Sequence, residues 1–224
     1  PVVTGPIIMV IGLSLAPTAV NFAMGMTGNG AERLFPYGEA LLVSTVALVT
    51  TMLVATLAHG LFRLLPILCG VLTGYLLALA LGMVDFGAVD QARWLAVPDF
   101  VAPSFHWPAI LFMIPVALAP AIEHVGDVLA ISNVTGKDYI KKPGLHRTLT
   151  GDGIASMAAA LFGGPPNTTY SEVTGAVMLT KVFNPVVMTW TAIFAIALGF
   201  IGKFGQLLQS IPTPVMGGIL ILMF

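Results

Sequence analysis

The chain has 224 residues, of which 57% are hydrophobic and only 8% are charged, and its mean hydropathy is +0.97. Because soluble domains carry about 25% charged residues and cannot hide this much apolar surface, the composition excludes a soluble fold and predicts an integral membrane protein. The net charge of −1 offers no basic surface, so we expect no nucleic-acid partner. The lone cysteine, Cys69, can form no disulfide within the chain.

Three long apolar stretches without a charged residue open the chain, at 6–26, 40–58 and 64–84. A transmembrane helix needs about 20 predominantly apolar residues, so each stretch predicts one span. Pro17 lies inside the first span and predicts a kink or a partly unwound turn there. The third span carries a Gly-x-x-x-Gly motif from Gly70, which predicts close contact with a neighbouring helix.

A more polar connection, residues 85–107, leads to a fourth span at 109–132 that differs from the first three because it contains Glu123, His124 and Asp127. A carboxylate in a membrane span costs about 2.5–3.5 kcal/mol, so an unpaired, lipid-facing one is not expected. We therefore expect this span to face the protein interior.

The second half of the chain has shorter apolar runs. A polar loop is predicted at 133–149. The apolar runs that follow are 154–162, 173–180, a full span at 185–202, and 215–224.

Both ends of the chain indicate an internal piece of a longer protein. The first residue is Pro1 rather than methionine, and the last apolar run is too short to span a bilayer. Residues 1–8 also resemble residues 214–221. This likeness predicts either two structural repeats, as in many transporters, or a chance similarity between two helix starts.

The loop charges predict the orientation in the membrane, because cytoplasmic loops carry an excess of Lys and Arg. Basic residues gather in alternate loops, which are therefore expected to face the cytoplasm; they are Arg63, Lys137, Lys141, Lys142, Arg147 and Lys181. The intervening loops lean acidic, and Lys203 is the exception.

The stretch NTTYSEVTG, residues 167–175, is polar although it lies between apolar runs. The preceding residues 163–166, GGPP, cannot continue a helix, and Asn167 to Tyr170 suit an extended strand. Ser171 is then expected to cap a short helix whose first turn contains Glu172. The pattern is typical of a discontinuous transmembrane helix, whose N-terminus offers backbone donors to a ligand at mid-membrane depth.

Glu123 and Asp127 are four residues apart and lie on one helix face. In a poorly hydrated pocket two carboxylates disturb each other's titration, so the pair is expected to share a proton. A purely structural role for Glu123, hydrogen-bonded to a neighbouring helix, and a helix-capping role for Glu172 stay open. His124 points about 100° away from Glu123 and is expected to support the site rather than to contact the ligand.

Enzyme motifs are missing from the sequence. There is no His-Glu-x-x-His, no Gly-x-Ser-x-Gly and no phosphate-binding loop, so we expect neither an enzyme nor a metal or other cofactor.

Several separated motifs resemble the nucleobase–ascorbate transporter family, and are most similar to its bacterial uracil–proton symporter branch. They are AIEHVGD (121–127), KDYIKKPGLHRTLTGDG (137–153), FGGPPNTTYSEVTGAVMLTKV (162–182) and IPTPVMGG (211–218). The resemblance implies an all-α polytopic fold of fourteen segments in two inverted repeats, of which this chain holds about segments five to twelve. It also implies a broken helix and a short strand near 165–172.

The resemblance implies a division into two domains. Residues 1–84 belong to a gate domain, 85–108 form an extracytoplasmic connection, 109–202 belong to a core domain, and 203–224 begin gate segment twelve.

Site residues follow from the same motifs. Glu123 matches the core glutamate that contacts the nucleobase, and Glu172 matches the glutamate that accepts ring N–H bonds, flanked by Tyr170 and Ser171. The resemblance also implies that Asp127 takes part in proton coupling together with Glu123. The supporting residues are His124, Thr169 and Gly175.

The implied function is proton-coupled uptake of uracil across the inner membrane, with the nucleobase, a proton and the lipid bilayer as partners and a homodimer as the candidate assembly. Two departures bear on the substrate: Asp127 stands where close uracil transporters have histidine, and Val173 replaces a usual asparagine. Glu172 and His124 favour the uracil branch over xanthine or urate. An anion transporter of the same architecture is a more distant alternative, since the site holds carboxylates and no cation.

Overall fold

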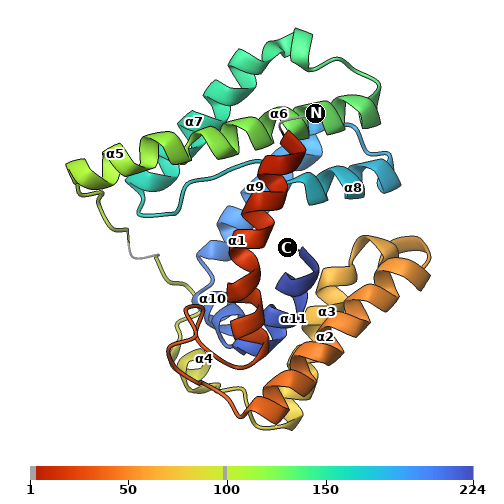
Figure 1. Cartoon of the computed structure of the whole chain (residues 1–224), viewed down its shortest axis with the longest axis vertical. Helices are drawn as coiled ribbons and strands as arrows, with labels where there is room; N and C mark the ends of the chain where they lie inside the picture. The colour runs from red at the N-terminus through yellow and green to blue at the C-terminus, as the bar shows by residue number, and fades with distance from the viewer. Residues whose placement is uncertain (1–3, 98–99, 224) are drawn as a thin grey trace. The chain divides into compact units, whose positions relative to one another are not determined.

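The computed structural model describes residues 4–97 and 100–223; the side chains of Ser171, Glu172 and several other residues lie outside this description. Its α-helices, coloured along the chain in Figure 1, are α1 (Thr4–Ala23), α2 (Tyr37–Leu57), α3 (Pro66–Ala80), α4 (Gly87–Gln91), α5 (Trp107–Val116), α6 (Leu118–Thr135), α7 (Leu145–Leu161), α8 (Ser171–Thr180), α9 (Pro185–Gly199), α10 (Gly202–Gln209) and α11 (Thr213–Met223). A 3₁₀ turn, η1 (Gly60–Leu64), and a π turn, η2 (Ile140–Gly144), complete them. In the described part of the chain, extended segments pair only at two isolated bridges. The all-α prediction is confirmed.

The chain divides into two compact units. One unit comprises residues 98–188 with the first nine residues, and the other comprises residues 10–97 and 189–224. The correspondence of these units to core and gate domains stays a prediction.

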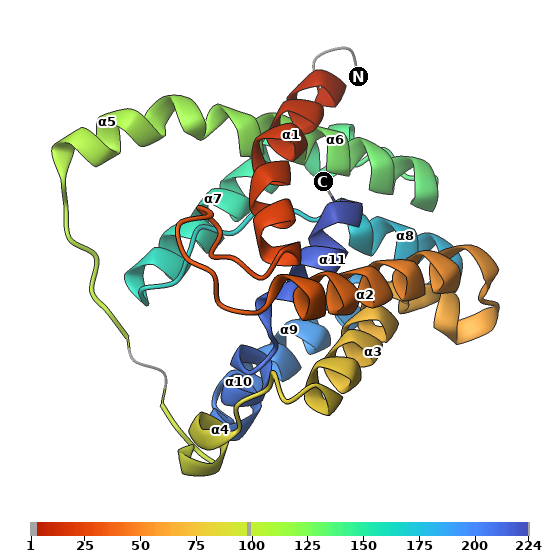
Figure 2. The same cartoon turned by 60° about the horizontal axis from the view of Figure 1, so that its bottom comes forward.

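The unit of residues 10–97 and 189–224 is built around α2, α3 and α11, which lie side by side in Figures 1 and 2. Its buried core contains small and β-branched side chains from all three helices, namely Val43, Ala47, Ala78, Val215 and Ile219. Residues of this size allow helix backbones to approach closely, as is typical of helix packing in membranes.

Close helix contact at the Gly-x-x-x-Gly motif is confirmed. A Cβ atom built on Gly70 of α3 would collide with Oγ1 of Thr51 in α2, and one on Gly74 would lie 3.0 Å from Cβ of Ala47. On α11, a Cβ on Gly218 would collide with the backbone oxygen of Ser44. Only glycine therefore fits where these helices touch.

Two helices are long and apolar enough to cross a membrane, counting only the described residues: α2, and α5 with α6 as one helix of 29 residues. The pair α10 and α11 passes the same test together, although it is bent by 76° at its break. The chain is thus a multi-pass membrane protein.

Of the two alternatives predicted for the first span, the unwound turn is wrong, and the kink stays a prediction. Helix α1 continues through Pro17 to Ala23, so no turn is unwound there. The side-chain amide of Asn21 instead donates to the backbone oxygen of Gly28 in the following loop, at 3.1 Å. Residues 1–3, where the predicted repeat begins, lie outside the described residues.

The polar loop predicted at 133–149 is shorter in the structure, where the connection comprises residues 136–144. Helix α6 continues to Thr135 and ends where Gly136 takes the left-handed conformation, and α7 already begins at Leu145. The hydroxyl of Thr135 donates to the backbone oxygen of Ile131, so this polar side chain is satisfied within the helix itself. In the short connection, Lys141 hydrogen-bonds to Asp138 and holds the pKa of that exposed carboxyl below its ordinary value.

Helix α10 was not predicted, because the sequence interpretation ended the 185–202 span at Gly202 and gave no element before 215. Its apolar residues Phe204, Leu207 and Leu208 recur at helical spacing, which indicates an amphipathic helix. Lys203 places its Nζ atom 5.4 Å from the centre of the Trp94 ring.

Candidate functional site

The candidate site lies within the unit of residues 98–188, where a break in the helical chain meets α6. Helix α7 ends at Leu161, and Gly163 has a φ of 78°, a conformation that glycine adopts readily. A Cβ on Gly163 would also lie 2.8 Å from the backbone oxygen of Val101, so a side chain is excluded there. The chain then runs without regular structure until α8 begins at Ser171.

The predicted discontinuous helix is thus present, with two differences in detail. Residues 164–170 are assigned no strand, because no described segment pairs with them. Tyr170, rather than Ser171, is the N-cap of α8, with an extended backbone and no side-chain capping bond. Ser171 and Glu172 are the first two helical residues, and their side chains lie outside the described ones.

Ser156 fixes the linker between the two helices to α7. Its hydroxyl donates to the backbone oxygen of Asn167 at 2.8 Å and accepts from the backbone nitrogen of the same residue at 3.1 Å. One hydroxyl therefore satisfies both backbone groups of a residue that no regular element could pair.

Thr169 fixes the same linker to α6. Its Oγ1 donates to Oδ2 of Asp127 at 2.5 Å, a bond between residues that lie 42 positions apart. Asp127 is 7% exposed, and a buried carboxylate needs such donors. The linker is therefore held on both sides immediately before α8 begins.

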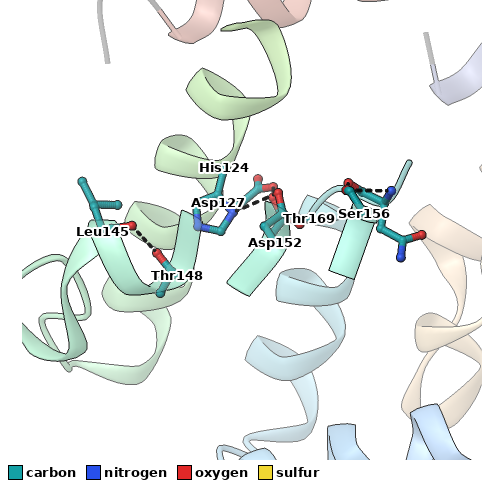
Figure 3. Close-up of polar contacts among 8 residues, drawn as sticks. His124, Asp127, Leu145, Thr148, Asp152, Ser156 and Thr169 are labelled. Atoms are coloured by element: carbon teal, nitrogen blue, oxygen red, sulfur yellow. Dashed lines mark hydrogen bonds and ion pairs between the residues drawn. The ribbon is translucent and has the colours of Figure 1, made fainter. Parts of the chain in front are cut away.

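His124 and Asp152 form a second polar contact between α6 and α7 (Figure 3). Nδ1 of His124 lies 3.8 Å from Oδ2 of Asp152, within ion-pair range but beyond a hydrogen bond. His124 is 3% exposed, and its supporting role stays a prediction. Figure 3 shows His124, Asp127, Asp152 and Thr169 gathered at one place between the helices.

These contacts form a closed circuit through three segments. It joins α6, α7 and the linker through His124, Asp152, Ser156, Asn167, Thr169 and Asp127. Asp152 and Ser156 are one helical turn apart, as are His124 and Asp127, so each helix contributes two residues from nearly one face. The linker is consequently positioned relative to both helices.

A pocket of about 360 Å³ opens beside this circuit. Its polar lining comes from Asp127, Thr169, Tyr170 and Thr174, and its apolar lining includes Val177. Small-molecule sites typically measure about 300–1,000 Å³ and combine apolar walls with a few polar groups. The pocket therefore has the size and the mixed lining of a small-molecule site.

The predicted site residues are only partly brought together. Asp127, Thr169 and Tyr170 line the pocket. Glu123 is half-buried in α6, one turn before Asp127, and is not among the described residues that line it. Gly175 lies in α8, where a Cβ would meet nothing within 4 Å.

Sequence reasoning missed Asp152 and Ser156. Asp152 is the one acidic residue between Asp138 and Glu172, and it directly precedes the apolar run 154–162. The signal that could have identified Asp152 from the sequence is a charged residue at the edge of an apolar run.

Comparison with known proteins decides the family. The model of a family described as the Permease family matches residues 1–224. The chain belongs to this permease family. The resemblance seen in the motifs is thereby confirmed, and permeases move solutes rather than catalyse reactions, as expected.

The permease is similar to several curated proteins. It is 57% identical over 224 residues to a probable uracil permease of Haemophilus influenzae, covering 100% of this chain and 53% of that protein. It is 47% identical over 233 residues to the uracil permease of Bacillus caldolyticus, covering 100% of this chain and 52% of that protein. It is 39% identical over 224 residues to the uracil permease of Escherichia coli K12, again covering 100% and 52%. The chain thus spans about half the length of these relatives.

Proposed function

We propose that this permease takes up uracil by proton symport across the inner membrane. We also propose that residues 109–202 form its core domain and that residues 1–84 and 203–224 belong to its gate domain. The names of the three relatives support uracil as the substrate. The observation that carries the proposal is the Thr169–Asp127 bond, which joins the broken helix to α6 beside a pocket of suitable size.

Uracil is bound at the start of α8. The backbone N–H groups at a helix N-terminus have no partner within the helix, so they donate hydrogen bonds to the carbonyl oxygens of the ring. Glu172, the second residue of α8, accepts an N–H bond from the ring, and Glu123 provides a further acceptor. Tyr170 and Ser171 contribute backbone groups on either side.

The proton is carried by Asp127 and Glu123. They lie one turn apart on α6, and like charges at this spacing repel each other in a poorly hydrated site. Binding of one proton relieves this repulsion, so loading of the proton and of the nucleobase are coupled. Asp127 also accepts the bond from Thr169, which connects its protonation to the position of the linker.

Equilibrium binding to the purified full-length permease tests this function. Titration with uracil and with xanthine is expected to give tighter binding of uracil. Tighter binding of xanthine would assign the purine alternative, which Asp127 favours because purine-type members tend to carry aspartate at this position.

A further inference from the structure

His124 is a buried ionisable side chain that has no role in the proposed transport mechanism. It is 3% exposed, and neither ring nitrogen has a hydrogen-bond partner among the described residues. A neutral imidazole has one donor and one acceptor, and each is expensive to leave unpaired in the protein interior. Both ring nitrogens of His124 are therefore buried polar atoms without a partner in the described part of the chain.

Asp152 supplies the charge that the protonated form requires. Its Oδ2 lies 3.8 Å from Nδ1 of His124, and its side chain is 20% exposed, whereas that of His124 is 4% exposed. A protonated imidazole donates from both nitrogens, so a small approach of the two side chains converts this contact into a charge-assisted hydrogen bond.

Other ionisable groups around His124 are few. On α6, Glu123 is adjacent in sequence and Asp127 is one turn away and bonded to Thr169. On α7, His146 and Arg147 are exposed in its first turn, and α5 carries no charged residue. The turn η2 carries the exposed Lys141 and Lys142. Helix α8, which also packs on α6, carries Glu172, whose side chain lies outside the description. Among described side chains on the packed elements, Asp152 is the acid that approaches His124 from another helix.

Asp152 is connected to the candidate site through a series of hydrogen bonds made by neighbouring residues. One turn further along α7, Ser156 holds Asn167 by two hydrogen bonds, and two residues later Thr169 is bonded to Asp127. These bonds form a continuous path of contacts from the His124–Asp152 pair to the linker that precedes α8.

We propose that His124 and Asp152 form a proton-dependent positioning pair: when His124 is protonated it draws α7 toward α6 and sets the linker at 164–170 in the binding geometry. The pair is separate from the carboxylates that the proposed symport uses, and its effect on substrate rests on the proposed function. It makes substrate affinity respond to pH through α7, in addition to any response of Asp127 and Glu123.

The first measurement is the thermal midpoint of the purified full-length permease between pH 5.5 and pH 8, which does not depend on transport. Imidazole carries its proton in the acidic part of this range and loses it as the pH rises. The pair is therefore expected to raise the midpoint at pH 5.5 relative to pH 8 by a few degrees. His124→Gln and Asp152→Asn should each remove this difference, and the double variant should remove no more than either single variant.

The second measurement is the KM for labelled uracil over the same pH range. Wild type and Asp152→Glu, which keeps the charge, are expected to share one pH profile, with KM rising severalfold towards pH 8. His124→Gln and Asp152→Asn should flatten that rise. His146→Gln, which changes an exposed histidine of α7, is the matched control and should leave both the midpoint and the KM profile unchanged.

The outcomes separate the two proposals. A wild-type protein that takes up no uracil but shows the pH-dependent midpoint would contradict the function and retain the pair. Identical midpoint profiles for wild type, His124→Gln and Asp152→Asn would overturn the pair. Strictly additive losses in the double variant would also overturn it, because they would show that the two residues act independently.

Discussion

Thr169 donates its hydroxyl hydrogen to Asp127 at 2.5 Å, and this one bond joins the linker before α8 to the middle of α6. The same linker is held from the other side by Ser156 of α7. Because neither a helix nor a sheet satisfies the backbone of residues 164–170, these side chains replace regular structure in fixing its path. The position of the α8 N-terminus depends on them.

Removal of the Thr169 hydroxyl should weaken substrate binding. Thr169→Val keeps the shape of the side chain but leaves the buried Asp127 without this donor, a loss of about 1.4 kcal/mol and hence roughly tenfold in affinity. Uracil binding to the full-length protein measures the change. Thr169→Ser, which retains the hydroxyl, is the control and should bind uracil within a factor of a few of wild type. Unchanged affinity in Thr169→Val would show that the bond does not support the site.

Replacement of Glu172 tests the proposed contact with the ring. Glu172→Ala should abolish uracil binding, because a ring N–H then loses its acceptor in a dry site. Glu172→Gln should weaken uracil, since an amide oxygen accepts less strongly than a carboxylate, and should improve binding of purines. Competition between labelled uracil and unlabelled xanthine measures both. Near-native uracil affinity in Glu172→Ala would remove this residue from the site.

The two carboxylates of α6 should differ in their roles. Asp127→Asn should leave uracil binding largely intact but uncouple uptake from the proton gradient, whereas Glu123→Gln should damage both. Uptake with and without an imposed gradient, alongside equilibrium binding, separates the two effects. Proton-driven accumulation that survives in Asp127→Asn would show that the proton travels by another route.

Helix contacts in the other unit predict a stability effect without a direct effect on the site. Gly218→Val introduces a side chain where a Cβ already collides with the backbone oxygen of Ser44, and such overpacking typically costs about 1–3 kcal/mol. The thermal midpoint of the purified protein should fall by several degrees. Gly38→Ala, at the start of α2 where a Cβ meets nothing within 4 Å, is the control and should leave the midpoint nearly unchanged. Equal midpoints in both variants would contradict the close packing of α11 on α2.

The broken helix could be predicted from sequence because its cause is local. Proline lacks the backbone donor that a helix needs, so Pro165 and Pro166 interrupt the chain whatever surrounds them. The strand predicted after them depends on a partner, and none of the described segments provides one. The N-cap was misplaced by one residue, a difference that residue type alone does not decide.

The contacts of the site could not be predicted, because they depend on how helices pack. His124 and Asp152 are 28 residues apart, and no sequence period brings them together. The bounds of the region predicted as a loop, 133–149, were wrong for a related reason. Its residues are polar, yet α6 and α7 extend into it, and the hydroxyls of Thr135 and Thr148 find acceptors on the helix backbone. The change from apolar to polar residues therefore shows where each apolar span ends, whereas the helices continue beyond that point.

Uptake of labelled uracil by the full-length permease in membrane vesicles tests the central claim most directly. With an inward proton gradient, uracil is expected to accumulate above its external concentration, and excess unlabelled uracil is expected to compete far better than xanthine. Collapse of the gradient by a protonophore should abolish the accumulation. Accumulation that is unaffected by the protonophore, or competition by xanthine that equals competition by uracil, would contradict the account.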